Sequence, residues 1–490
     1  MAGLHFRNAS WSGLAAAVRA AAGLLSALLA IRLLGPSQYG HVATWLSLFV
    51  LYLSLNSSAF TMVVVNLMAI DGEAHRQQRT AVTAAAARFC LWSLAALAGL
   101  TALLSASATQ LPVAVTSLPK DFGEVILFMG ALTAIQIFVA FQVALIEGAG
   151  RLDLATKWQL LGPMVTLGVL ATSFFIGSAF GAHAYLILLC VAGGVDLALL
   201  WRIRRLLDLP LSLTGPVVGD PASVLELLRS GGLLQASSLL NLFLEPVNKF
   251  LLNHFAGSAV VAIYDLAMKV IWGIQHLVGA AMRVFLHIGS QDSAAVSRTF
   301  ARAIVLLGVP VVAMHIAGTL FLFFAAHYWL AIEGTQLIVF FGIATISNLG
   351  MIFVTPLYLT LISRHDLVFI CRTQAVLATV NVAVSASAIP LLGVVGAAFG
   401  LLAATIFNAI AIYLRCSIDL GVHSDVDAPM PRARRRVALA IILLVATIAW
   451  STSWSSQPLV IVAILAGLGA MMAGEPLVAR MTEQFVARHT

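Results

Sequence analysis

The chain has few charged residues for a protein of 490 residues. Asp, Glu, Lys and Arg together make up 10% of the sequence, whereas soluble domains carry about 25%. The mean hydropathy is +1.00, and the longest stretches between apolar segments, near 204–221 and 420–436, are too short to fold alone. The composition therefore excludes a sizeable soluble domain and predicts a membrane protein.

Cysteine is also scarce, and Cys90, Cys190, Cys371 and Cys416 stand alone in the sequence. Because no Cys or His lies at ligand spacing from them, we expect neither a disulfide framework nor a metal site. The net charge of +7 does not indicate a nucleic-acid partner, since most cations lie in short loops beside apolar segments. The arginines within 432–436 are expected to touch the anionic headgroups of membrane lipids.

About fourteen apolar stretches follow one another along the chain. Each is long enough, or nearly so, to cross the ~30 Å hydrocarbon core of a bilayer as a helix of about 20 residues. The expected spans are 10–34, 38–69, 80–108, 122–147, 154–178, 181–203, 222–253, 258–290, 299–324, 335–362, 366–390, 394–419, 437–452 and 457–474. The sequence thus predicts an all-α protein that crosses the membrane many times.

The basic residues between these stretches are unevenly distributed. Nineteen of the 27 Lys and Arg residues lie in alternate loops and at the two chain ends, whereas the opposite loops hold Lys120 alone. The positive-inside rule places the loops rich in Lys and Arg in the cytoplasm. Both termini are therefore expected to be cytoplasmic.

The two halves of the chain share three short matches at nearly constant offset, which indicates an internal duplication. Gly181 matches Gly396, Arg151 matches Arg364, and Gly35 matches Gly257, at offsets of 215, 213 and 222 residues. The offset corresponds to six spans, so both copies have the same orientation. Parallel repeats about an axis along the membrane normal are a transporter architecture, with the substrate path between the lobes. We predict an N-terminal lobe at 1–210, a C-terminal lobe at 211–420 and two additional helices within 421–490.

Three motifs carry a resemblance to a known family. They are RLLGPSQYG at 32–40, YDLAMK at 264–269 and IPLLGVVGAA at 389–398. These motifs resemble those of bacterial Wzx-like polysaccharide flippases, a branch of the multidrug/oligosaccharidyl-lipid/polysaccharide exporter superfamily, and the resemblance covers about residues 10–420. It implies a MATE-like architecture of two six-helix lobes, a central cavity and a lipid-linked sugar as cargo.

Charged residues inside membrane spans are costly and point to function. Arg19 lies about nine residues inside the first span, among small residues, and either faces a substrate cavity or forms a buried structural pair. Glu245 and Lys249 share one face of the seventh span and flank Pro246, which frees a backbone carbonyl at a plausible hinge. They either neutralise each other or line a cavity; in transporters that this chain resembles, the seventh helix lines the cavity and bends.

The eighth span carries a one-sided polar stripe. Its members recur at helical spacing, with apolar residues such as Val270 and Ile274 on the opposite side. The stripe contains Asp265, Lys269, Trp272, His276, Arg283 and His287. Because such a stripe cannot face lipid, it faces either a partner helix or a water-filled cavity.

The favoured cavity residues carry a net positive charge. The cations are Arg19, Lys249, Lys269 and Arg283, and the acidic residues are Glu245 and Asp265. A cationic cleft attracts anions, and Arg suits phosphate recognition. His276 and Trp272 are further candidates for binding the substrate, Trp272 by stacking on a sugar ring. Glu245, Asp265 and Asp196 are candidates for coupling transport to H+ or Na+; Asp196 alternatively pairs with a nearby Arg. No cofactor is expected.

These features predict a transporter rather than an enzyme. We expect a flippase of the bacterial inner membrane that moves polyprenyl-diphosphate-linked oligosaccharide repeat units for exopolysaccharide, O-antigen or capsule biosynthesis. Its expected partners are that lipid-linked glycan, membrane lipids and glycan-assembly proteins such as a polysaccharide polymerase. Two alternatives stay open: an ion-coupled multidrug exporter of the same superfamily, which needs an acidic cavity, and a membrane glycan-transfer or polymerising enzyme, which needs larger loops or domains.

Overall fold

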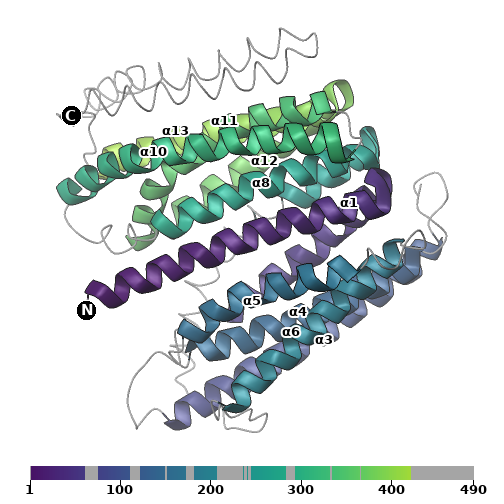
Figure 1. Ribbon diagram of the computed structural model, residues 1–490. Helices are drawn as coiled ribbons and strands as arrows, with labels where there is room; N and C mark the ends of the chain where they lie inside the picture. Colours follow the sequence, from purple (N-terminus) through teal and green to yellow (C-terminus); the bar gives the residue numbers. More distant parts are fainter. Residues whose placement is uncertain are drawn as a thin grey trace. The chain divides into compact units, whose positions relative to one another are not determined.

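In the residues that it describes, the computed structural model contains helices as its regular structure (Figure 1). It describes residues 2–60, 76–110, 122–148, 152–172, 181–206, 236, 240, 244–282, 293–330, 334–364 and 366–420. The chain forms two compact units, Met1–Pro246 and Val247–Thr490. The spans expected at 437–452 and 457–474 lie outside the described residues, so the count of fourteen and the cytoplasmic termini stay predictions, as do the lobe boundaries.

Nine helices in the described part of the chain are long and apolar enough to cross a membrane. The first, Leu14–Ser54, has 41 residues. A helix of that length is about 60 Å long, twice the thickness of the hydrocarbon core. It belongs to α1 (Ala2–Phe60), which kinks at Gly35, where φ is 77° and ψ is 158°. The kink divides α1 into the first two expected spans.

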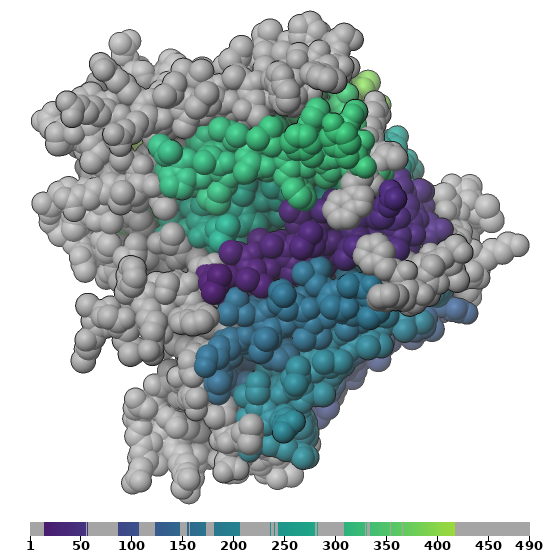
Figure 2. All heavy atoms as spheres, viewed as in Figure 1, coloured from purple at the N-terminus to yellow at the C-terminus, as the bar shows by residue number. Residues whose placement is uncertain are grey.

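The described part of the first unit up to residue 206 is a bundle of five helices. They are α1, α3 (Arg76–Gln110), α4 (Phe122–Gly148), α5 (Leu152–Ala171) and α6 (Ala182–Leu206). Helix α1 packs against α5 and α4, while α6 packs against α4 and α5. Figure 2 shows the purple surface of α1 directly beside the blue surface of α5. The apolar stretches expected at 80–108, 122–147 and 181–203 thus form membrane-length helices, and α5 covers the described part of the stretch expected at 154–178.

The second unit is built around a deeply buried central helix, α11 (Gly334–Ser363). Around it pack α8 (Ser258–Met282), α10 (Ser293–Phe324) and α13 (Val394–Leu420), and α12 (Leu367–Leu392) lies along α13. Phe340 and Phe341 of α11 are fully buried. A π-helical turn, Ala325–Leu330, follows α10. Residues 244–255 are also helical, which confirms the second half of the seventh expected span.

The first helix junction of each unit is formed by a glycine with a positive φ. Gly35 has φ 77° between the two halves of α1, and Gly257 has φ 91° just before α8. A side chain on either residue would strain the backbone, because L-residues rarely adopt this conformation. These are the two glycines that the sequence comparison of the halves pairs with each other. The two matched glycines therefore also share a positive φ angle.

Small residues allow a close approach between α12 and α13. A Cβ atom added to Gly396 would overlap the backbone of Ala388, and one added to Gly400 would overlap Ser385 Oγ. Such contacts let helices pack tightly in the membrane without large side chains. The GVVGAA segment thus fixes how these two helices cross within the second unit.

Candidate functional site

A buried ionic cluster in the second unit joins Lys249 to α8. Lys249 Nζ lies 2.6 Å from Asp265 Oδ1, and Lys269 Nζ lies 3.5 Å from Asp265 Oδ2. The side chains of Lys249 and Asp265 are each only 4% exposed, while that of Lys269 is 38% exposed. Two cations therefore share one carboxylate, and these three side chains together have formal charge +1.

A chain of buried amides lies next to this ionic cluster. Asn381 Nδ2 of α12 donates to Asn248 Oδ1 at 3.2 Å, and Asn248 Nδ2 donates to the Tyr264 hydroxyl of α8 at 3.4 Å. Asn248 and Asn381 are fully buried. Since Asn248 and Tyr264 immediately precede Lys249 and Asp265, the amide chain holds the backbone segments that carry the ion pair.

Helix α8 presents its two sides differently, as the sequence pattern predicts. Val270, Ile274 and Val278 are buried in the core of the second unit. On the polar side, Trp272 is half-buried and His276 is exposed. The polar stripe thus begins at the buried Asp265 and becomes more exposed along the helix. Arg283 and His287 lie outside the described residues.

Arg19 begins a second polar chain, in the first unit. Its Nη2 donates to Gln159 Oε1 of α5 at 2.9 Å, and Gln159 Nε2 lies 3.5 Å from Glu147 Oε1 of α4. Arg19 itself is exposed. The guanidinium is therefore positioned by a neutral amide while it remains accessible, a geometry that suits an anion-binding side chain.

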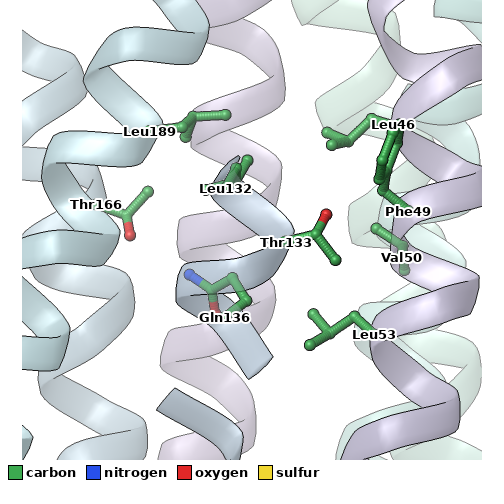
Figure 3. Close-up of a pocket in the computed structure, with 9 residues that line it drawn as sticks. All are labelled: Leu46, Phe49, Val50, Leu53, Leu132, Thr133, Gln136, Thr166 and Leu189. Atoms are coloured by element: carbon green, nitrogen blue, oxygen red, sulfur yellow. The ribbon is translucent and has the colours of Figure 1, made fainter. Parts of the chain in front are cut away.

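A pocket of about 180 Å³ opens among the helices of the first unit (Figure 3). The second half of α1 supplies an apolar wall that includes Phe49 and Leu53, and the other helices add Thr133, Gln136 and Thr166. The two threonine hydroxyls donate to carbonyls one turn earlier in their own helices. The amide of Gln136 is thus the principal polar group that this pocket offers to a ligand.

Asp196 lies on α6 at the contact with α5. It is 6% exposed, and a Cβ atom added to Gly162 would lie 3.4 Å from its Oδ2. Its Oδ1 has no hydrogen-bond partner among the residues that the structure describes. A carboxylate in such a position is costly when ionised.

Glu245 is half-buried at the end of the first unit.

Sequence reasoning missed the amide chain and the contact between Lys249 and Asp265. Asn248 and Asn381 are polar residues within long apolar stretches, and that signal was present in the sequence. It also missed His315 of α10, which is fully buried between the Val311 carbonyl and Asn348. Among the described residues, no group of three His, Cys, Asp or Glu side chains could hold a metal ion.

Solved structures with the same fold are membrane transporters. A MOP-superfamily transporter from Pyrococcus furiosus is 14% identical with a TM-score of 0.61, covering 84% of this chain and 95% of its own. A Vibrio cholerae MATE transporter is 13% identical with a TM-score of 0.59, covering 86% and 97%. An inward-facing multidrug-resistance MATE transporter is 15% identical with a TM-score of 0.55, covering 88% and 95%.

The fold is therefore that of the MATE transporters, as expected, while the fourteen spans and the two six-helix lobes stay predictions. The model of the family described as "Polysaccharide biosynthesis protein" matches residues 6–286, more than half of the chain. The chain belongs to this family of polysaccharide biosynthesis proteins, which confirms the resemblance to polysaccharide flippases. A search of curated proteins finds no match. The fold is that of known multi-pass membrane transporters.

Proposed function

We propose that the protein is a flippase that moves polyprenyl-diphosphate-linked oligosaccharide from the cytoplasmic to the outer face of the bacterial inner membrane. The family supports a role in making a surface polysaccharide such as an exopolysaccharide, O-antigen or capsule. The single observation that carries the choice of cargo is the ionic cluster of Lys249, Asp265 and Lys269, whose two cations share one carboxylate. A site with excess positive charge favours an anionic cargo over a cationic drug.

The diphosphate is the part of the cargo that these cations fit best. Lys269 is the accessible cation of the cluster, since its side chain is 38% exposed. Arg19 in the first unit presents an exposed guanidinium, which can bind phosphate oxygens in pairs. In the proposal, Lys249, Lys269 and Arg283 attract the diphosphate, Trp272 and His276 contact the sugars, and Arg19 is a separate candidate for phosphate binding in the first unit.

The proposed transport cycle is alternating access between two lobes. The polyprenyl tail stays in lipid while the charged headgroup passes through the protein. Binding to the cations has to be moderate, because a very tight site would not release its cargo. Glu245, Asp265 and Asp196 are the proposed sites for coupling to H+ or Na+; of these, Asp196 combines deep burial with an unpartnered oxygen.

The test measures lipid-linked oligosaccharide on each face of the inner membrane after depletion of the protein in its host. The depleted cells then express either the wild-type protein, the Lys269→Gln variant or the Arg283→Ala variant. The matched control is Arg372→Gln, which removes an exposed cation of α12 outside the proposed site. Each variant is first quantified in the membrane, so that loss of protein is separated from loss of transport.

The proposal predicts that depletion makes lipid-linked oligosaccharide accumulate on the cytoplasmic face. Wild type and Arg372→Gln should reverse this accumulation, whereas Lys269→Gln should reverse it poorly. Unchanged oligosaccharide on both faces after depletion would contradict flipping. A gain of sensitivity to cationic drugs, with normal surface glycan, would instead favour the multidrug exporter. Full activity of both Lys269→Gln and Arg283→Ala would leave flipping in place and remove the cationic site.

A further inference from the structure

The end of α6 carries a buried arginine that the transport site does not use. Arg204 is 6% exposed, and its Nε and Nη1 atoms have no hydrogen-bond partner among the described residues. Arg is almost never buried without a counter-charge. Its guanidinium carbon lies 4.2 Å from the centroid of the Trp201 ring, a cation–π contact that holds one face of the group. The N–H groups of Nε and Nη1 stay unsatisfied within the part of the chain that the structure describes.

A second cation adds to the local positive charge. The guanidinium carbon of Arg205 lies 5.6 Å from the centroid of the same Trp201 ring, and Arg205 is exposed, as is Arg202. Two guanidinium groups beside one ring repel each other unless an anion lies between or beside them. The arrangement therefore favours a bound anion with several acceptor oxygens.

The position of α6 shows from which side such an anion arrives. Val191, Val195 and Leu199 are spaced one turn apart and are 49%, 40% and 39% exposed. This apolar stripe on a membrane-length helix faces lipid, and Trp201 and Arg205 lie on an adjoining part of the exposed surface at the helix end. Trp at the end of a span is typical of the membrane–water interface. The opposite part of the helix end is anchored, since Leu200 and Ile203 pack against Ile146, Ala155 and Trp158.

We infer that Arg204, Arg205 and Trp201 form a binding site for the phosphate headgroup of an anionic membrane phospholipid. The phosphate oxygens would accept from the free N–H groups of Arg204 and from Arg205, and one acyl chain would lie along the stripe of Val191, Val195 and Leu199. By the positive-inside rule this end of α6 faces the cytoplasm, where anionic lipids bind basic pockets of membrane proteins. The site is independent of the proposed cargo site.

The experiment uses the full-length protein in a neutral detergent. Its melting temperature is measured with increasing phosphatidylglycerol, with phosphatidylcholine, and with inorganic phosphate, and retained lipid is identified by native mass spectrometry. We expect phosphatidylglycerol to raise the melting temperature and to remain bound, and phosphatidylcholine to do neither. Stabilisation by inorganic phosphate equal to that by phosphatidylglycerol would overturn a lipid site in favour of a site for small anions.

The variants distinguish a specific lipid-binding site from the general effect of positive surface charge. Arg202→Gln removes an exposed cation two residues away and should weaken phosphatidylglycerol binding by no more than about fivefold, the effect of one charge near an anionic surface. Arg204→Gln should weaken it more than tenfold, and equal losses for the two variants would refute the site. If Arg204→Gln fails to fold, the exposed Arg205→Gln serves the same comparison and should lose more than Arg202→Gln.

Discussion

The buried pair of Lys249 and Asp265 makes a sharp prediction about stability. Replacing Asp265 by Asn leaves the ammonium group of Lys249, whose side chain is 4% exposed, without its counter-charge at 2.6 Å. Removing one partner of a buried ion pair costs about 3–5 kcal/mol. For a unit of this size, each kcal/mol lowers the melting temperature by about 2–4 °C. We therefore expect Asp265→Asn to lower the melting temperature by about 6–20 °C.

A double variant separates the ion pair from its surroundings. The double variant Lys249→Met/Asp265→Asn removes both charges from the buried site. Replacing a whole buried ion pair often changes the free energy of unfolding little. The double variant should therefore recover most of the stability that either single variant loses. Because Lys249 also belongs to the proposed diphosphate site, the recovered protein should still transport less than wild type.

The assay is thermal denaturation of the purified protein, with size-exclusion chromatography as the readout of folded protein. The values for wild type, the two single variants and the double variant form a double-mutant cycle. The control is a second ion pair of the same unit, between Arg415 Nε and Asp366 Oδ2 at 2.9 Å, whose side chains are 41% and 24% exposed. Asp366→Asn should cost no more than about 1 kcal/mol, because exposed pairs contribute little. Additive losses in the Lys249 and Asp265 cycle would refute the coupling on which this reasoning depends.

Three further predictions concern single residues. Gly35→Ala should lower the melting temperature, since φ is 77° there, whereas Gly99→Ala, within α3 and with open space around it, should be tolerated. Gly400→Ala should destabilise the contact of α12 with α13 by about 1–3 kcal/mol through overlap with Ser385; an unchanged melting temperature would contradict the packing. Asp196→Asn should preserve or raise stability, because it removes a buried charge, and should abolish the ion dependence of transport measured in proteoliposomes if Asp196 couples an ion.

Much of the fold could be predicted from the sequence because bilayer helices carry a strong local signal. Span length follows from the thickness of the hydrocarbon core, and the apolar stretches at 122–147 and 335–362 agree with α4 and α11 to within one residue at each end. The kink at Gly35 was predictable as well, since a Gly-Pro pair inside an apolar run marks a junction.

The contacts within the site could not be predicted in the same way. Helical spacing places Lys249 next to Glu245 and Lys269 next to Asp265, because these pairs are four residues apart on one helix. The contact of Lys249 with Asp265 joins two helices across the turn at Gly257, and periodicity carries no information about which faces of two helices meet. The amide chain from Asn381 to Tyr264 depends on tertiary packing for the same reason.

The geometry of the ionic cluster also assigns different roles to its two lysines. Lys249 is buried and makes the short contact to Asp265, so it holds that carboxylate in place. Lys269 is partly exposed and makes the longer contact of 3.5 Å to the other oxygen, so an arriving phosphate can replace Asp265 as its partner at lower cost. In the proposed cycle, Lys269 pairs with Asp265 again when the phosphate leaves, which keeps binding of the cargo moderate. Lys269→Gln should therefore impair transport with little change in stability, whereas Lys249→Met should reduce both; the opposite ranking of the two variants would contradict this division of roles.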